Sequence, residues 1–198
     1  MLSECILSGE RTRLRPADER DLSAFVKWLA DPEVRYWIAL PEAPDLAAEE
    51  EWLEETRAQE DRLAWAIESS EGQLLGTVEL RNVDEYEGRA ELGIAIMDKS
   101  CWSQGYGSDA LRSVLAHSFG ELELRRISLT VDADNARAVR CYERLGFARE
   151  GVLRAHRLRE GEPVDALVMA ILRQDWQASL LPPRMDQREG DDPSLALP

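Results

Sequence analysis

Cys101-Trp-Ser-Gln-Gly-Tyr-Gly-Ser-Asp-Ala110 is the stretch of this sequence that decides the fold. Its two glycines, Gly105 and Gly107, allow backbone amides to approach a ligand closely. A helix is predicted to begin near Gly107, because apolar residues then recur with helical spacing at Leu111, Val114, Leu115 and Phe119. The positive end of that helix points at the glycines, and this combination is typical of a pyrophosphate-binding site.

Two other interpretations fit the same glycines. Residues 105–110 match the dinucleotide fingerprint Gly-x-Gly-x-x-Gly/Ala, and Asp132 stands 22 residues after Ala110. In that fingerprint the first glycine follows its strand almost at once, whereas residues 98–104 intervene here, and this context disfavours a nicotinamide cofactor and an oxidoreductase. The segment also fits an ordinary turn into a helix that Ser108 caps.

The flanking sequence predicts one domain of the α/β (α+β) class, followed by a flexible acidic tail at 177–198. We expect a mixed, twisted sheet of about seven strands with about four helices. Asp18 is expected to cap the first helix, and Asp31 and Pro32 are expected to end it. A second helix is predicted at about 46–59, with its carboxylates facing solvent. The expected strands are 11–15, 63–68, 74–83, 90–97, 126–132, 147–153 and 164–172.

A second motif follows, Asn135-Ala-Arg-Ala-Val-Arg-Cys-Tyr-Glu-Arg-Leu-Gly-Phe147, which begins 28 residues after Gly107. Together the two motifs resemble the GNAT superfamily of acyl-CoA-dependent N-acetyltransferases, and the resemblance covers about residues 11–176. It implies that the parallel strands 90–97 and 126–132 splay apart to admit the pantetheine arm of acetyl-CoA. The family's phosphate loop usually begins with Gln or Arg, and Trp102 resembles the variant of the ribosomal-protein, polyamine and aminoglycoside acetyltransferases.

The resemblance also implies which residues bind acetyl-CoA and which one acts as an acid. Tyr142 matches the tyrosine that gives a proton to the departing thiolate, although an aromatic residue on the apolar face of a helix is also typical of a core. Asn135 heads its helix, where it can be an N-cap as well as a cofactor ligand. The implied cofactor-binding residues are Ile96, Met97, Trp102, Ser103, Gln104, Gly105, Tyr106, Gly107, Ser108 and Asn135.

A base is needed as well, because an amine must be neutral before it attacks a thioester and a lysine-like amine has a pKa of about 10.4 in water. Glu91 and Glu79 are the candidates. Glu91 opens the strand expected to carry the thioester carbonyl, and the small Gly93 and Ala95 leave room on its face of that strand. We therefore prefer Glu91. Glu79, on the preceding strand, can share a water molecule with it or bind a cationic substrate, although a strand glutamate that faces solvent is the commoner case.

The three cysteines, Cys5, Cys101 and Cys141, lack the spacing of a metal site or a disulfide framework. Neither a metal nor a disulfide is therefore expected. Cys101 and Cys141 lie near the motifs and suggest a covalent acyl-cysteine, but neither His117 nor His156 accompanies them in sequence as a base. We therefore expect the amine to attack acetyl-CoA directly in a ternary complex.

The composition limits the partners. Asp and Glu number 39 against 24 Lys and Arg, and the net charge of −15 repels nucleic acids and anionic membranes. The cysteines are odd in number and lack the spacing of a disulfide framework, and the N-terminus does not resemble a signal peptide. We therefore expect a cytoplasmic location. A primary amine, small or at a protein N-terminus, is the expected acceptor, and a homodimer is compatible with the sequence. The alternative function is a non-catalytic acyl-CoA-binding module, although Glu91 and Tyr142 disfavour it.

Overall fold

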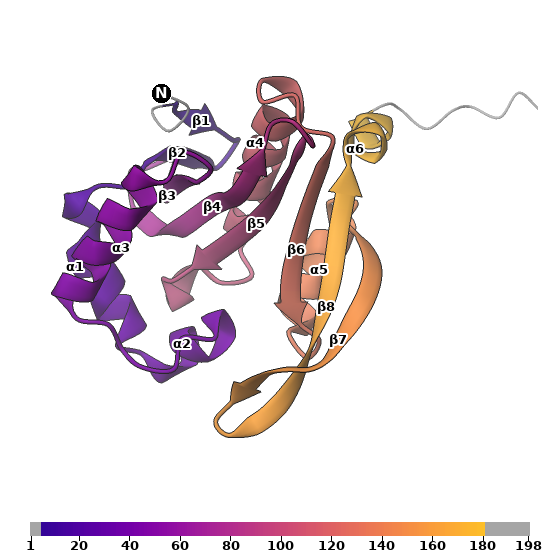
Figure 1. Ribbon diagram of the computed structural model, residues 1–198. Helices are drawn as coiled ribbons and strands as arrows, with labels where there is room; N and C mark the ends of the chain where they lie inside the picture. Colours follow the sequence, from indigo (N-terminus) through magenta and orange to yellow (C-terminus); the bar gives the residue numbers. More distant parts are fainter. Residues whose placement is uncertain (1–4, 181–198) are drawn as a thin grey trace, which may run out of the picture.

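The computed structural model describes residues 5–180, and these form one sheet of eight strands with six α-helices and a short 3-10 helix (Figure 1). The strands are β1 Leu7–Ser8, β2 Thr12–Pro16, β3 Leu63–Ser69, β4 Leu74–Asp84, β5 Arg89–Ile96, β6 Arg126–Asp132, β7 Ala148–Arg159 and β8 Glu162–Leu172. The helices are α1 Glu19–Leu29, α2 Pro32–Ile38, α3 Leu46–Ala58, η2 Lys99–Cys101, α4 Tyr106–Gly120, α5 Ala136–Arg144 and α6 Arg173–Leu180.

The sheet is mixed, as expected, in the order β1-β2-β3-β4-β5-β6-β8-β7. Within residues 5–180, β5 and β6 are the only neighbouring strands that run parallel. Their pairing covers three positions, of which Glu91 opposite Ser128 is the last. Beyond Glu91 the two strands diverge, and Figure 1 shows the sheet opening between them. The predicted splay is therefore confirmed.

Helices cover both faces of the sheet, and β3 shows how its side chains are divided between them. Leu63, Trp65 and Ile67 point into the larger core, which also contains apolar residues of α4 and α5. Ala66 points to the other face, into a smaller core formed with α1, α2 and α3. This alternation is the expected behaviour of a strand buried on both sides. No helix within residues 5–180 is long and apolar enough to cross a membrane.

The first helix begins as predicted but does not lead into a loop. Asp18 and Asp21 form a capping box at the start of α1, and Leu22, Phe25 and Leu29 are buried. Helix α1 ends at Leu29, just before Asp31 and Pro32, as expected, but these two residues also begin α2. The Asp31 carboxylate accepts the backbone N–H of Glu33 at 2.9 Å, and Pro32 takes the first helical position. That pair is a favourable helix start, since proline has no N–H to lose there.

The expected counts of strands and helices were slightly low. The structure adds β1, α2 and α6 to the elements read from the sequence. Helix α6 extends to Leu180, so residues 177–180 of the expected tail are helical, and Trp176 packs near Phe119 with ring centroids 6.4 Å apart. The remainder of the expected tail, 181–198, lies outside the described residues.

Candidate active site

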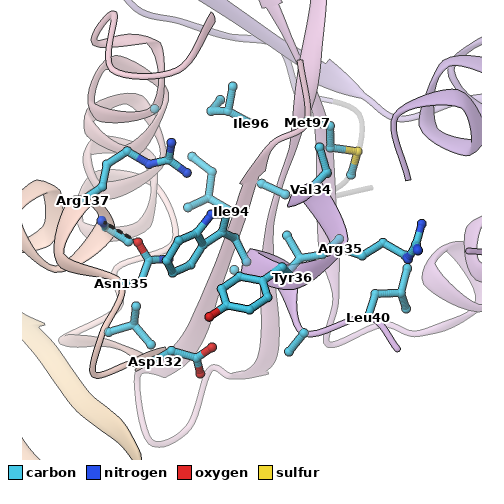
Figure 2. Close-up of a pocket in the computed structure, with 18 of the residues that line it drawn as sticks. Val34, Arg35, Tyr36, Leu40, Ile94, Ile96, Met97, Asp132, Asn135 and Arg137 are labelled. Atoms are coloured by element: carbon cyan, nitrogen blue, oxygen red, sulfur yellow. Dashed lines mark hydrogen bonds between the residues drawn. The ribbon is translucent and has the colours of Figure 1, made fainter. Parts of the chain in front are cut away.

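A cavity of about 1520 Å³ lies where β5 and β6 diverge. Pockets for one small molecule usually measure about 300–1,000 Å³, so this cavity has room for a cofactor and an acceptor together. Figure 2 shows Asn135 and Arg137 of the α5 region on one side, with Val34, Arg35 and Leu40 from α2 and its following turn on the opposite side. Two different walls therefore face each other across the opening of the sheet.

The glycine segment forms the start of α4, whose N-cap is Gly105 with a φ of 91°. This left-handed conformation favours glycine, and no side chain caps the helix. The alternative interpretation, in which Ser108 caps the helix, is contradicted, since Gly105 is the N-cap and Ser108 Oγ lies 3.4 Å from Cys141 Sγ. Uncapped backbone N–H groups at the positive end of a helix fit the pyrophosphate of acetyl-CoA.

The loop residues expected to bind the cofactor do not all face the cavity. Ser103, Gly105, Tyr106, Gly107 and Ser108 line it. Gln104 is held on the outside of the loop. Its side-chain Nε2 donates to the backbone carbonyl of Ser100 at 2.5 Å. Its backbone carbonyl accepts a hydrogen bond from the Arg11 guanidinium. Gln104 thus fixes the shape of the loop.

Trp102, at the position where the sequence departs from the usual motif, joins the loop to the end of β5. Its Nε1 donates to the carbonyl of Ile96 at 2.6 Å. Ile96 and Met97 line the cavity, and the backbone N–H of Met97 donates to the carbonyl of Leu75 at 2.8 Å. The hydrogen bond from the indole to Ile96, the last residue of β5, therefore holds the end of this strand beside the loop.

Arg137 belongs to the second motif and lines the cavity, although no role was predicted for it. Its guanidinium lies 4.0 Å from the centroid of the Trp102 ring. Arg140 and Arg144 of α5 also line the cavity, so this wall is cationic. Two features of the sequence pointed to it, namely a basic residue near the start of a helix and its closeness to Asn135. Three arginines and a helix N-terminus form a wall that attracts phosphates.

Tyr142 and Asn135 both lie on α5 and both line the cavity. Asn135 acts as the N-cap, since its Oδ1 accepts the backbone N–H of Ala138 at 3.1 Å, which leaves its amide nitrogen for another partner. Tyr142 is buried and packs near Phe147, with ring centroids 5.7 Å apart. Burial, together with the nearby Cys141, raises the pKa of Tyr142 well above its ordinary value. The phenol therefore stays protonated.

The two candidate bases line the same face of the opening in different surroundings. Glu79 is a partly buried residue of β4, and its Oε2 accepts from Nε and Nη2 of Arg62 at 3.0 and 2.7 Å. Its carboxylate lies across Gly93, where a Cβ atom would meet Oε1 at 3.1 Å. Glu91 is exposed, lines the cavity, and forms no hydrogen bond or ion pair within residues 5–180. Glu91 is the carboxylate available to a new partner.

Neither thiol near the motifs is paired with a histidine in the part of the chain that the structure describes. The buried His117 lies in the last turn of α4, with Nε2 3.6 Å from Cys5 Sγ and its ring centroid 6.0 Å from that of Trp65. Cys101 is buried, and Cys141 contacts Ser108. His156 lines the cavity from an irregular part of β7. Within residues 5–180, neither Cys101 nor Cys141 contacts a histidine, and the Cys5–His117 contact does not line the cavity.

Two elements that line the cavity are joined by a contact that the sequence did not predict. Arg159, at the end of β7, lies over the ring of Tyr36 in α2, 4.0 Å from its centroid. The same guanidinium donates to Asp132 at the end of β6, at 3.0 Å, and also pairs with Asp134. Figure 2 shows Asp132 beside Tyr36. Helix α2 is thereby fastened to the β7–β8 hairpin across the opening.

Comparison with known proteins agrees with this geometry. Residues 11–148 match the model of the acetyltransferase (GNAT) domain. This chain belongs to the GNAT family. The chain is therefore an N-acetyltransferase that uses acetyl-CoA, and the dinucleotide-dependent oxidoreductase is ruled out. The enzyme transfers an acetyl group from acetyl-CoA to an amine.

Individual relatives of this acetyltransferase differ in their acceptors. An L-amino acid N-acetyltransferase of Escherichia coli (strain K12) is 30% identical over 160 residues, which cover 79% of this chain and 95% of the relative. A spermidine N(1)-acetyltransferase of the same strain is 27% identical over 173 residues, covering 86% and 91%. The crystal structure of the Vibrio cholerae spermidine N-acetyltransferase with CoA and spermine has a TM-score of 0.78 at 24% identity, covering 84% and 98%, and shares the fold.

Proposed function

We propose that this acetyltransferase passes the acetyl group directly from acetyl-CoA to a primary amine within a ternary complex. The observation that carries the proposal is the single cavity with two chemically different walls. The wall of α4 and α5 offers helix amides and arginines to the phosphates of acetyl-CoA. The wall of β4 and β5 offers the carboxylates Glu79 and Glu91 to a cationic amine.

In this proposal Glu91 collects the proton of the amine, directly or through a water molecule. Glu91 occupies the last paired position before β5 and β6 diverge, so it stands at the fork through which the pantetheine arm would enter. It has no protein partner within residues 5–180, whereas Glu79 is held by Arg62 and lies 3.5 Å from Arg81. Glu79 then orients groups on this wall, and Glu91 acts as the base.

Tyr142 acts as the acid that protonates the departing thiolate. Its raised pKa keeps the phenol protonated in neutral solution, as a general acid must be. The phenol can then give its proton to the thiolate of CoA. Asn135, with its amide nitrogen unused by the helix cap, is proposed to donate a hydrogen bond to the cofactor or to a water molecule in the site. Acetyl-CoA supplies the activated acetyl group, Glu91 removes a proton from the amine, and Tyr142 gives a proton to the thiolate.

The acceptor is proposed to be a primary amine with little negative charge. One relative, a spermidine N(1)-acetyltransferase, is named for an acceptor of this kind. The test is an assay of thiol release from acetyl-CoA with a panel of diamines, monoamines, amino acids and peptides with free N-termini. We expect release with at least one amine and none without an amine. Tight binding of acetyl-CoA with no release from any amine would support the binding-module alternative.

We further propose that the enzyme is cytoplasmic and forms a homodimer along β7. This edge strand is exposed along its length and carries the apolar Val152 and Leu158, which are 56% and 73% exposed. Unpaired strand edges with apolar side chains favour pairing between copies. Native mass spectrometry of the wild type and of Leu158→Glu tests this, because a dimer through β7 should dissociate in the variant.

A further inference from the structure

Helix α3 contains one carboxylate that differs from all its neighbours. Glu49 is only 9% exposed, while Glu50, Glu51, Glu54 and Glu55 face solvent. It lies on the inner side of the helix together with Leu53 and Thr56, at the spacing of one helical face. The expectation that the carboxylates of this helix form a solvated face is therefore wrong at Glu49.

Glu49 has no partner for its charge. No hydrogen bond or ion pair to its side chain is present in the described part of the chain, and burial raises its pKa. Two cations of this region have other partners. Arg35, which lines the same cavity, donates to the carbonyls of Leu29 and Ala30. Arg62, 5.9 Å from the centroid of the Trp52 ring, pairs with Glu79. An unpaired carboxylate in such surroundings is costly, so a partner from outside the chain would stabilise it.

The side chain lines the main cavity, where its neighbours are aromatic. Phe25 of α1 and Trp52 of α3 also line this part of the cavity, with ring centroids 6.1 Å apart in an edge-to-face arrangement. Glu49 thus stands at the edge of an apolar surface that suits a chain of methylene groups. The cationic wall for the cofactor belongs to α4 and α5, whereas α3 lies on the opposite face of the sheet. An anionic cofactor would be repelled by Glu49.

We propose that Glu49 binds a second ammonium group of the acceptor, so that the substrates of this enzyme are diamines or polyamines. The inference rests on the proposed function, because it requires one amine to react while another stays charged. The reacting nitrogen must be neutral, so the cation that pairs with Glu49 is a different nitrogen of the same molecule. Trp52 would contact the methylene groups between the two nitrogens, and the buried Phe25 packs against Trp52.

The experiment compares a diamine with the monoamine of equal chain length, using Glu49→Gln and the matched variant Glu50→Gln. Gln keeps the shape and removes the charge. We expect Glu49→Gln to lower the ratio of kcat/KM for the diamine to that for the monoamine by about tenfold or more, mainly through KM, since hydrogen bonds to charged groups are the strong ones. Glu50→Gln, on the exposed side of the same helix, should leave the ratio unchanged.

A second readout is thermal stability without any acetyl-CoA. The diamine should raise the Tm of the wild type and of Glu50→Gln but not that of Glu49→Gln, which is expected to fold because it removes an unpaired buried charge. An unchanged ratio, or equal losses for both amines, would overturn the role of Glu49 while acetyl transfer stands. Activity with monoamines but not diamines would also overturn it. Failure of every amine would instead overturn the proposed function, and the assignment of Glu49 with it.

Discussion

The guanidinium of Arg137 is stacked on the indole of Trp102, 4.0 Å from the ring centroid. One residue comes from the start of α5 and the other from the loop before α4, so the contact joins the two motifs. No ion pair to Arg137 is present within residues 5–180, and its charge is therefore available to a ligand. An aromatic ring beneath a guanidinium also fixes its position before a phosphate arrives.

Arg137→Gln should weaken CoA binding by about tenfold, because one charge-assisted hydrogen bond to phosphate is lost. Isothermal titration with CoA measures the change. Arg20→Gln is the matched control, since Arg20 is exposed on α1 and pairs with Asp18. Equal affinities of Arg137→Gln and the wild type would remove Arg137 from the cofactor site.

Tyr142→Phe should lower kcat by about 10²-fold and leave the Kd of acetyl-CoA nearly unchanged, because only proton delivery to the thiolate is lost. Steady-state rates and a separate binding titration provide the two numbers. Tyr86→Phe serves as the control, since Tyr86 is 96% exposed in a turn. If Tyr142→Phe kept the wild-type rate, Tyr142 would be a core residue only.

The raised pKa of Tyr142 also predicts how stability changes in alkaline solution. In the unfolded chain a tyrosine loses its proton at about pH 10, whereas the buried phenol of Tyr142 retains it. The contribution of Tyr142 to stability is therefore complete below pH ~10 and declines as the pH rises above that value. Urea unfolding between about pH 9 and 11 should show a smaller decline for Tyr142→Phe. Identical slopes for variant and wild type would argue against the burial of this phenol.

Glu91→Gln and Glu79→Gln should separate the base from its neighbour. Glu91→Gln is expected to lower kcat/KM by about 10²-fold at neutral pH. The loss should shrink toward pH ~10, where the amine deprotonates in solution. Glu79→Gln should instead cost about 1–3 kcal/mol of unfolding free energy, because Arg62 loses a charged acceptor. The reverse pattern, with a pH-dependent rate loss only in Glu79→Gln, would assign the base to Glu79.

Asp109 anchors the start of α4 to the N-terminal strands and should control acid stability. Its carboxylate accepts the backbone N–H groups of Glu10, Arg11 and Thr12 and the hydroxyl of Thr12, the last at 2.7 Å. Burial alone would raise the pKa of Asp109, but these hydrogen bonds bring it below its ordinary value. The stability that they provide is complete above pH ~3.9 and is lost as the pH falls through the lowered pKa.

Asp109→Asn should therefore lose about 3 kcal/mol of unfolding free energy at pH ~7 and show less acid sensitivity below pH ~4. Urea titrations at the two pH values measure both effects. Asp45→Asn is a suitable comparison, because Asp45 caps α3 from an exposed position and its change should cost less than about 1 kcal/mol. A loss at Asp109 no larger than that at Asp45 would contradict the anchoring role.

Local signals in the sequence were sufficient for the elements whose ends and faces are strongly marked. Asp18 predicted the start of α1, and Asn135 predicted the start of α5, because each is a typical capping residue. Helix α2 was missed because Asp31 and Pro32 fit both the end of one helix and the start of another. Strand β1 has two residues and depends on its pairing with β2, which no local pattern reveals.

The same distinction applies to the site. The two motifs predicted the cavity-lining glycines, Asn135 and Tyr142, because each carries a local signature. The burial of Glu49 depends on how α3 packs on the sheet, and the contact between Arg159 and Tyr36 joins residues far apart in the chain. Gln104 matched the motif in sequence, yet its side chain bonds to Ser100. Tertiary packing decides these positions.

The most direct test of the central claim is an initial-rate study in which acetyl-CoA and a primary amine are varied together. Direct transfer across one cavity requires both substrates to be bound at once, so double-reciprocal plots should give lines that intersect. No acetyl group should remain on the enzyme when it is incubated with acetyl-CoA alone and examined by mass spectrometry. Parallel lines, with an acetylated cysteine in the absence of amine, would show a covalent intermediate and contradict the account.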